Sequence, residues 1–475
     1  MTATGTLTDP TDLEAIRRGL AALDPEGRLA PLGIGRIEIS DTAHLHVAEA
    51  LAEALVAAGR PSRATVVILA DTTPIRRDGE LLAGLVERQL AGHHAVQLAR
   101  LDGGHGALHA DETVLAMAAE AARGADAIVT IGSGTMTDVG KIAAERNGGI
   151  PHVAVQTAAS VDGFTDNVSV ILRNGVKRTV PSRWPSAVLA DVTTIAGAPQ
   201  GMNTAGFGEA ISLFTAPADW YLSFLLGLDH TFHPASLAML QAAAAEPPDW
   251  SAGIARGEPR AVRELTRLLA LRGIVSGVSN TTACLSGVEH VISHMLDLHH
   301  AAHHQPIGLH GAQVGVASLV ATRLWREAID TRVITPSLLR KPEPARIEGL
   351  IRQAFGQLGD GIVAECLRDA EAKHAAVIRN WARFEQVVAD WPRHAEAFAK
   401  LVTPSATLRK ALAASGGPAS FQRLSPAISP ELTVWATRNC FLMRNRFNLV
   451  DLLDMMGLWT EERIAWALAE TLEAA

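Results

Sequence analysis

The chain has 475 residues, of which 48% are hydrophobic and 19% are charged. This balance is typical of a folded globular protein and excludes extensive disorder. Lys and Arg number 42 and Asp and Glu number 50, which gives a formal charge of −8 at pH 7. A nucleic-acid-binding protein needs a basic surface and often uses aromatic side chains to stack on bases, but aromatic residues are only 4% here. We therefore expect no nucleic-acid partner.

The cysteines and the apolar runs indicate a cytoplasmic protein without a membrane span. Cys284, Cys366 and Cys440 are far apart and odd in number, as is typical of a reducing compartment. The first twenty residues carry acidic side chains and no apolar core, so we expect no secretory signal. No run approaches about 18 consecutive apolar residues, the length that a spanning helix needs.

Short apolar runs alternate with amphipathic segments over the first 200 residues. The runs cover 64–70, 125–131, 153–155 and 187–190, and helical stretches at 81–90 and 112–123 lie among them. This alternation predicts a parallel sheet covered by helices on both faces. We therefore expect a Rossmann-like α/β domain over residues 1–200.

The strand signal fades after residue 200, and long helical patterns replace it. They cover 205–226, 261–275, 286–299, 311–328, 347–355, 362–388, 432–456 and 460–472. Several are apolar on nearly every face, which is typical of helices buried in a bundle. The pattern predicts an all-α second domain over residues 201–475.

A strand-like run at 128–131 leads directly into Gly132-Ser133-Gly134-Thr135. Two glycines let the backbone turn tightly and approach a ligand, and the N–H groups that start the next helix favour an anion. The spacing is not the GxGxxG of an ordinary dinucleotide site, so a plain capped turn is an equal interpretation. Asp71, at the end of an earlier run, could bind an adenosine ribose or simply cap a turn.

Seven of the 18 histidines lie between His290 and His310. His290 and His294 are four residues apart and share a helix face, and neutral imidazoles suit zinc, nickel or iron. Glu209 is a charged residue in a very apolar helix, where it needs a cation or a metal. Glu209, His290 and His310 are therefore candidate metal ligands, with three unrelated polar residues at helix ends as the alternative. The stretch from His299 to His304 is predicted to be a solvated loop.

Seven segments of the chain together form a specific pattern. They are IGSGTMTDVGK (131–141), QTAASVDGFTD (156–166), GVKRTVPSRWPSAVLAD (175–191), AGFGEAISLFTAPADW (205–220), SGVEHVISH (286–294), HGAQVGVAS (310–318) and NRFNLVDLLDMMGLW (445–459). In this order they resemble the dehydroquinate synthase-like superfamily, and most closely its sn-glycerol-1-phosphate dehydrogenase branch, which is iron-containing alcohol dehydrogenase-like. This resemblance covers most of the chain.

The resemblance implies an N-terminal domain that binds NAD or NADP and a C-terminal helical domain that holds one divalent metal. Besides Asp71, the cofactor-binding residues would be Gly132, Ser133, Gly134, Thr135 and Asp138 at the pyrophosphate and nicotinamide end, with Thr157 and Ser160 lining the nicotinamide pocket. Glu209, His290 and His310 would bind the metal, Asp162 would face the substrate and His294 would lie beside it. Zinc is the expected metal, with nickel or iron as alternatives.

The implied reaction transfers a hydride from a carbinol carbon to the nicotinamide, while the metal stabilises the substrate alkoxide. A small-molecule polyol or polyol phosphate is then the expected substrate, and we expect a homo-oligomer. The alternative is a sugar-phosphate cyclase or lyase that uses NAD only transiently. A protein that keeps the fold without turnover is a further alternative.

Three positions depart from the dehydrogenase branch. The first metal ligand is usually Asp, and here it is Glu209, as in the cyclising synthases. A usual Lys is replaced by Leu213, and a usual Arg is missing from the stretch that includes Ala283. Two cations that could pair with a phosphate are therefore absent, so we predict a substrate that is larger or less charged than glycerol 1-phosphate.

Overall fold

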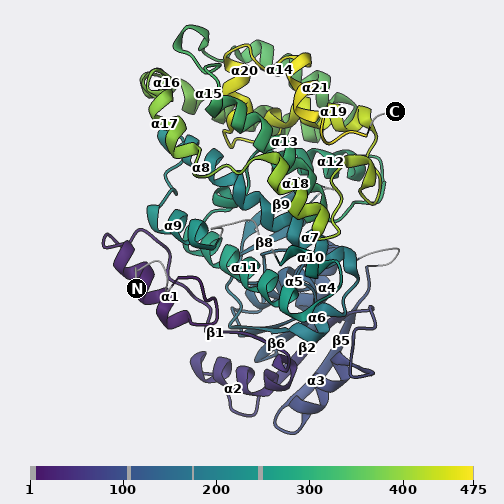
Figure 1. Ribbon diagram of the computed structural model, residues 1–475. Coiled ribbons are helices and arrows are strands. Elements are labelled where there is room, and N and C mark those ends of the chain that lie inside the picture. Colours follow the sequence, from purple (N-terminus) through teal and green to yellow (C-terminus); the bar gives the residue numbers. More distant parts are fainter. Residues whose placement is uncertain (1–6, 104–107, 174–175, 244–249, 474–475) are drawn as a thin grey trace. The chain divides into compact units, whose positions relative to one another are not determined.

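The computed structural model describes residues 7–103, 108–173, 176–243 and 250–473 (Figure 1). These parts form two compact units, one made of 7–206 with 234–243 and 250–280, the other of 207–233 with 281–473. The sequence placed the boundary at residue 200 and assigned everything after it to the second domain. In the structure, helices α9 (Pro234–Ala243), α10 (Ser251–Ile254) and α11 (Pro259–Val278) belong to the first unit.

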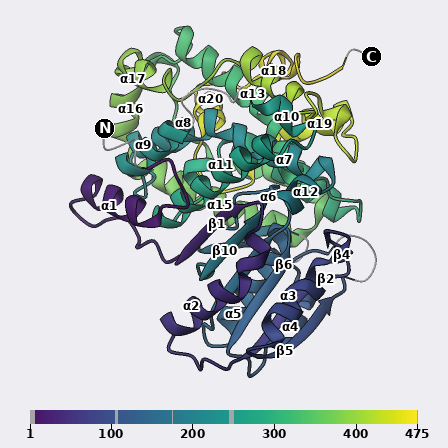
Figure 2. The same cartoon turned by 60° about the horizontal axis from the view of Figure 1, so that its bottom comes forward.

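A six-stranded parallel sheet forms the centre of the first unit, as predicted. In spatial order its strands are β1 (Arg36–Ser40), β10 (Ala187–Asp191), β7 (His152–Gln156), β6 (Ala127–Gly132), β2 (Thr65–Asp71) and β5 (Ala95–Leu101) (Figure 2). Because all six strands run the same way, their carboxyl ends meet at one edge of the sheet. The ends of β6, β2 and β5 are neighbours there: Ala70 pairs with Ile131 on one side and with Arg100 on the other.

Helices cover both faces of this sheet, which explains why its central strands are apolar without alternation. Helices α2 (Val47–Ala57) and α3 (Leu82–Ala91) pack on the face that includes Val66 and Ile68. Helices α4 (Glu112–Ala121) and α5 (Gly134–Arg146) pack on the opposite face, with Val67 and Leu69 (Figure 1). Successive residues of a strand therefore contact opposite helical layers, and every second residue contacts the same layer.

The sequence missed several elements of the first unit. They are the edge strands β1 and β5, the helix α1 (Leu13–Leu23), the short helix α6 (Val192–Ala196) and two antiparallel hairpins, β3 (Arg76–Arg77) with β4 (Glu80–Leu81) and β8 (Val168–Arg173) with β9 (Val176–Pro181). Edge strands and hairpins are only half buried, so polar residues interrupt their apolar pattern.

The described part of the second unit is helical, as predicted. Its elements include the end of α7 (Gln200–Ile211), then η3 (Ser212–Phe214), α8 (Ala216–Leu225), η4 (Ala283–Leu285), α12 (Val288–Ala302), α13 (His310–Asp330), α14 (Pro344–Phe355), α15 (Asp360–Arg379), α16 (Trp381–Ala389), α17 (Trp391–Phe398), α18 (Ser405–Ala414), α19 (Pro430–Asn439), α20 (Leu449–Met455) and α21 (Glu461–Leu468). None of the described helices in either unit combines the length and the apolar character that crossing a membrane requires.

Some predicted helices are divided and one predicted loop is helical. The stretch predicted as one helix over 205–226 breaks at Thr215, one position before α8 begins with a proline in its first turn. The stretch predicted over 362–388 is two helices separated at Asn380. The predicted solvated loop at His299 to His304 is wrong for its first four residues, because α12 continues through Ala302 and buries His300.

Candidate metal and nucleotide sites

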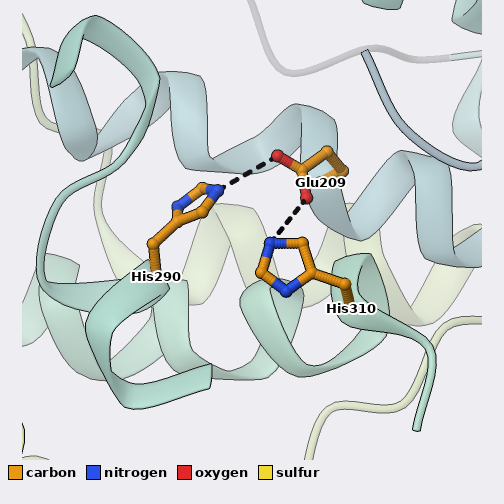
Figure 3. A group of neighbouring side chains, drawn as sticks. All are labelled: Glu209, His290 and His310. Atoms are coloured by element: carbon orange, nitrogen blue, oxygen red, sulfur yellow. Dashed lines mark hydrogen bonds and ion pairs between the residues drawn. The ribbon is translucent and has the colours of Figure 1, made fainter. Parts of the chain in front are cut away.

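Three helices of the second unit bring the candidate metal ligands together. Glu209 lies on α7, His290 in the first turn of α12, and His310 at the first position of α13. The carboxylate lies between the two rings, with Oε1 3.1 Å from His290 Nε2 and Oε2 3.7 Å from His310 Nε2 (Figure 3). One ligand atom from each residue lies within 4.8 Å of the others, so residues that are a hundred positions apart converge on one point.

Glycines determine how closely α7 and α13 approach each other. A Cβ on Gly208, the residue before Glu209, would overlap the carbonyl oxygen of Gly311, and a Cβ on Gly315 would lie 2.8 Å from Gly208 Cα. Only glycine allows backbones to pack at this distance. The close packing of these two helices therefore carries Glu209 to the start of α13, where His310 is located.

Glu289 orients His290 from behind. Its fully buried carboxylate accepts hydrogen bonds from His290 Nδ1 at 2.8 Å, Gly287 N at 2.7 Å and Thr215 Oγ1 at 2.9 Å. This arrangement leaves Nε2 of His290 directed at Glu209, as in the carboxylate–histidine pairs that support metal ligands. Burial opposes protonation of His290, but the Glu209 and Glu289 carboxylates outweigh it and raise its pKa to about 9.

His310 has its own supporting residues on α12 and α13. Ser293 Oγ lies 3.0 Å from His310 Nδ1 and donates to Oε1 of Gln313 at 2.7 Å. The ring of His294 stacks on His310 with centroids 5.3 Å apart and planes 7° from parallel. His294 is therefore beside the ligand group, and its place beside a substrate stays a prediction.

This donor set suits a catalytic divalent metal. Two imidazole nitrogens and one carboxylate are the ligands that zinc, iron and nickel accept, and three protein ligands leave positions for a substrate and water. The ligands also have the outer hydrogen-bond partners that metal sites usually have. The observed geometry therefore fits one metal held by Glu209, His290 and His310.

The candidate nucleotide residues gather at the carboxyl edge of the sheet in the first unit. Ser133 is the N-cap of α5, and Gly132 ends β6, where its carbonyl oxygen accepts a hydrogen bond from Thr157 N at 3.1 Å. Thr157 and Ser160 are buried just after β7, the neighbouring strand, and Asp71 ends β2 on the other side of β6. Ligands of open parallel sheets bind at this edge. The nucleotide role of these residues stays a prediction.

Asp138 lies among buried charges on α5. Its Oδ2 accepts a hydrogen bond from Val170 N at 3.1 Å, and Oδ1 lies 3.5 Å from Lys141 Nζ. Lys141 is fully buried and also binds Asp166. Burial raises the pKa of Asp138 to about 7, although Lys141 opposes this effect. These contacts serve the packing of α5 on the β8–β9 hairpin, and the cofactor role of Asp138 stays a prediction.

Asp162 forms an ion pair that the sequence did not reveal. Its Oδ2 lies 3.1 Å from both Nε and Nη2 of Arg272, a fully buried residue of α11. Thr165 donates to the carbonyl oxygen of Ala270 at 2.8 Å, and a Cβ on Gly273 would overlap the same loop. The segment from Asp162 to Thr165 is therefore held firmly on α11. The predicted contact between Asp162 and a substrate is untested.

Known proteins resemble this chain in sequence and in fold. A family model described as iron-containing alcohol dehydrogenase matches residues 43–199. The glycerol-1-phosphate dehydrogenase (NAD(P)+) of Bacillus licheniformis is 31% identical over 332 residues, which cover 70% of this chain and 78% of that protein. The chain belongs to the glycerol-1-phosphate dehydrogenase family. The family member from Bacillus velezensis is 32% identical over 262 residues, covering 55% of this chain and 66%, or just under two thirds, of that relative.

The fold agrees with this family membership. The structure of NADH-dependent butanol dehydrogenase A from Thermotoga maritima superposes with a TM-score of 0.52 over 91% of this chain and 98% of that one, at 15% identity. At this level of identity the likeness concerns the fold alone. The resemblance inferred from the seven segments is thus confirmed by the family relatives.

Arg446 is a cation near the metal-ligand helix that the sequence did not point out. Its guanidinium donates to the carbonyl oxygen of Ser286 at 3.2 Å and to Thr282 Oγ1 at 3.1 Å. It therefore contacts the segment that includes Ala283, the segment from which the sequence comparison found an arginine missing. Leu213, at the other altered position, is buried in η3. The sequence contained the signal for Arg446 in the NRFNLVDLL segment, but nothing in the sequence showed where that segment folds.

Proposed function

We propose that this protein is an NAD(P)-dependent, divalent-metal-dependent dehydrogenase that acts on a polyol or a polyol phosphate. One observation carries the proposal: a carboxylate and two imidazoles converge within 4.8 Å in a member of the glycerol-1-phosphate dehydrogenase family. Zinc is the metal we propose first, with nickel and iron as alternatives. A bound metal of this kind supplies Lewis acidity to the substrate hydroxyl, and the nicotinamide accepts the hydride.

The residues of the second unit would prepare the substrate. Glu289 and Ser293 would fix the rings of His290 and His310, so their nitrogens are already directed toward a metal, whose binding would displace the proton on His290. His294, parallel to His310 at 5.3 Å, would contact the substrate and exchange a proton with it. In the first unit, Asp162 would be oriented toward the substrate by its ion pair with Arg272.

The first unit would bind the cofactor at the carboxyl edge of its sheet. The Gly132 to Thr135 turn would accept the pyrophosphate, because the first N–H groups of α5 favour an anion. Thr157 and Ser160 would line the nicotinamide pocket, and Asp71 would bind the adenosine ribose. We also propose a cytoplasmic location, supported by three buried cysteines that form no disulfide. Homo-oligomerisation stays a prediction, which light scattering of the purified protein would check.

Steady-state kinetics test the reaction and its substrate together. The metal-loaded protein is assayed with NADH and NADPH against dihydroxyacetone phosphate, dihydroxyacetone and larger ketoses with and without phosphate. We expect turnover with net nucleotide oxidation, and a kcat/KM below about 10⁴ M⁻¹s⁻¹ for dihydroxyacetone phosphate. A higher value would refute the proposed change of substrate, while consumption of a sugar phosphate without net nucleotide oxidation would identify the cyclase alternative.

A further inference from the structure

A small, open hollow lies at the carboxyl edge of the sheet in the first unit. Its walls come from the ends of three adjacent strands, with Asp71 from β2, Arg100 from β5 and Ile131 from β6. Thr73 and Ile75, which follow β2, complete one side. The hollow begins where the proposed pyrophosphate turn begins, because Ile131 directly precedes Gly132.

The order of the strands sets the order in which a dinucleotide would meet these residues. The glycine turn follows β6, Asp71 ends the adjacent strand β2, and Arg100 lies near the end of the edge strand β5. A cofactor whose pyrophosphate binds at the glycine turn would therefore place its adenosine ribose over Asp71. Any group on the far side of that ribose would reach Arg100.

The two polar side chains present opposite charges to this position. The backbone N–H of Thr73 occupies Oδ1 of Asp71 at 2.9 Å, so Oδ2 is the oxygen that can accept a ribose hydroxyl. Nη1 of Arg100 lies 3.4 Å from the carbonyl oxygen of Asp71, which places the guanidinium beside the ribose position. Arg100 is exposed and forms no ion pair with the residues that the structure describes, so its charge is available to a ligand.

We propose that Arg100 binds the 2′-phosphate when the cofactor is NADP(H). The inference rests on the proposed function and deepens it by naming the residue that determines cofactor specificity. The carboxylate of Asp71 binds the free 2′-hydroxyl of NAD(H) and repels a phosphate there. The guanidinium of Arg100 compensates for that repulsion with charge-assisted, bidentate hydrogen bonds to the phosphate oxygens.

Binding of adenosine nucleotides tests Arg100 without requiring turnover. Dissociation constants for adenosine 2′,5′-bisphosphate and for 5′-AMP are measured by calorimetry on the wild type, Arg100→Gln and Arg100→Lys. We expect Arg100→Gln to weaken the bisphosphate by about tenfold or more and 5′-AMP by less than about twofold, because a lost charge-assisted pair is felt only by the 2′-phosphate. Arg100→Lys, which keeps the charge, should lie between wild type and Gln.

Arg76→Gln is the matched control, because Arg76 is an exposed arginine of the nearby β3–β4 hairpin whose guanidinium donates to the carbonyl oxygen of Gly79 at 2.7 Å. It should leave both dissociation constants unchanged. Equal weakening of both ligands by Arg100→Gln would mean that Arg100 contacts the adenine, and an unchanged bisphosphate affinity would mean that it contacts neither; both results overturn the inference. If the wild type binds neither ligand, nor NADH nor NADPH, the proposed function itself fails.

Discussion

Replacing Glu289 with glutamine tests how the ligand His290 is held. In the structure Oε1 of Glu289 accepts hydrogen bonds from both Gly287 N and His290 Nδ1, whereas Oε2 accepts one from Thr215. A glutamine can keep its carbonyl oxygen at the first position and direct its NH2 group toward Thr215. Because the threonine hydroxyl can rotate to accept that hydrogen bond, the geometry survives and only the negative charge is lost.

The lost charge should weaken the metal site specifically. A hydrogen bond to an ionised group is roughly twice as strong as a neutral one, and substitution of such outer partners typically costs about 10- to 100-fold in metal affinity, or about 1.4–2.7 kcal/mol. The thermal stability of the fold should not decrease. Burial and the neighbouring Glu289 carboxylate raise the pKa of Asp219 to about 7, so removing the Glu289 charge relieves a buried repulsion. We expect the Tm of metal-free Glu289→Gln to equal or exceed that of the wild type.

Metal competition and calorimetry separate these two effects. Metal-free protein is titrated with Zn²⁺ against a chromophoric chelator, and its Tm is measured without metal. Glu327→Gln on α13 is the matched control, because this carboxylate binds Arg463 at 2.9 and 3.1 Å rather than a metal ligand. Identical metal affinity in wild type and Glu289→Gln would refute the role of Glu289. A large fall in Tm without metal would show that the residue mainly supports folding.

Three other changes test the remaining structure. His290→Ala should lose metal and activity together, and a full equivalent of metal by elemental analysis would contradict the ligand assignment. A Cβ on residue 134 would overlap Cγ2 of Val161, so Gly134→Ala should lower both Tm and NAD(P)H affinity in fluorescence titrations, and adding Val161→Ala should recover Tm but not affinity. Burial and Lys141 lower the pKa of His152 from 6.5 to about 3, so below pH 6.5 the unfolded chain binds a proton that the folded one does not. His152 alone should then lower the free energy of unfolding by up to about 1.4 kcal/mol for each pH unit that the pH falls between 6.5 and 3, and the difference between the urea unfolding of wild type and of His152→Gln measures this contribution.

The sequence predicted the elements that are buried on all sides and missed those that are not. Strands β2, β6, β7 and β10 are nearly continuous apolar runs because helices cover both of their faces. Strand β5 lies at the sheet edge, where Gln97 and Arg100 face outward and interrupt its pattern. Local apolar periodicity therefore reports burial, and an edge strand carries too little of it to be recognised.

The candidate site shows a similar limit. The types and spacing of Glu209, His290 and His310 indicated a metal site, and the structure brings their ligand atoms together. The pairing of Asp162 with Arg272 joins residues more than a hundred positions apart, and no local pattern contains it. A sequence can show that a buried charge needs a partner. Only the fold shows which residue is that partner.

Arg446 bears on how strongly the protein would bind a phosphorylated substrate. Compared with the dehydrogenase branch that the sequence resembles, the chain lacks two cations, at Leu213 and in the stretch that includes Ala283. Leu213 is buried in η3 and has no substitute there in the described contacts, but the guanidinium of Arg446 binds the segment that contains Ala283. It also lines a pocket with Gly287 and Val291, which flank His290 on α12. Burial lowers the pKa of Arg446, yet arginine stays protonated in proteins. Arg446 is therefore a cation near the metal ligands, but it lies in a segment that carries the family resemblance and replaces neither lost cation. Dihydroxyacetone phosphate should then be disfavoured by the two lost charged hydrogen bonds, each worth about 1.5–3 kcal/mol.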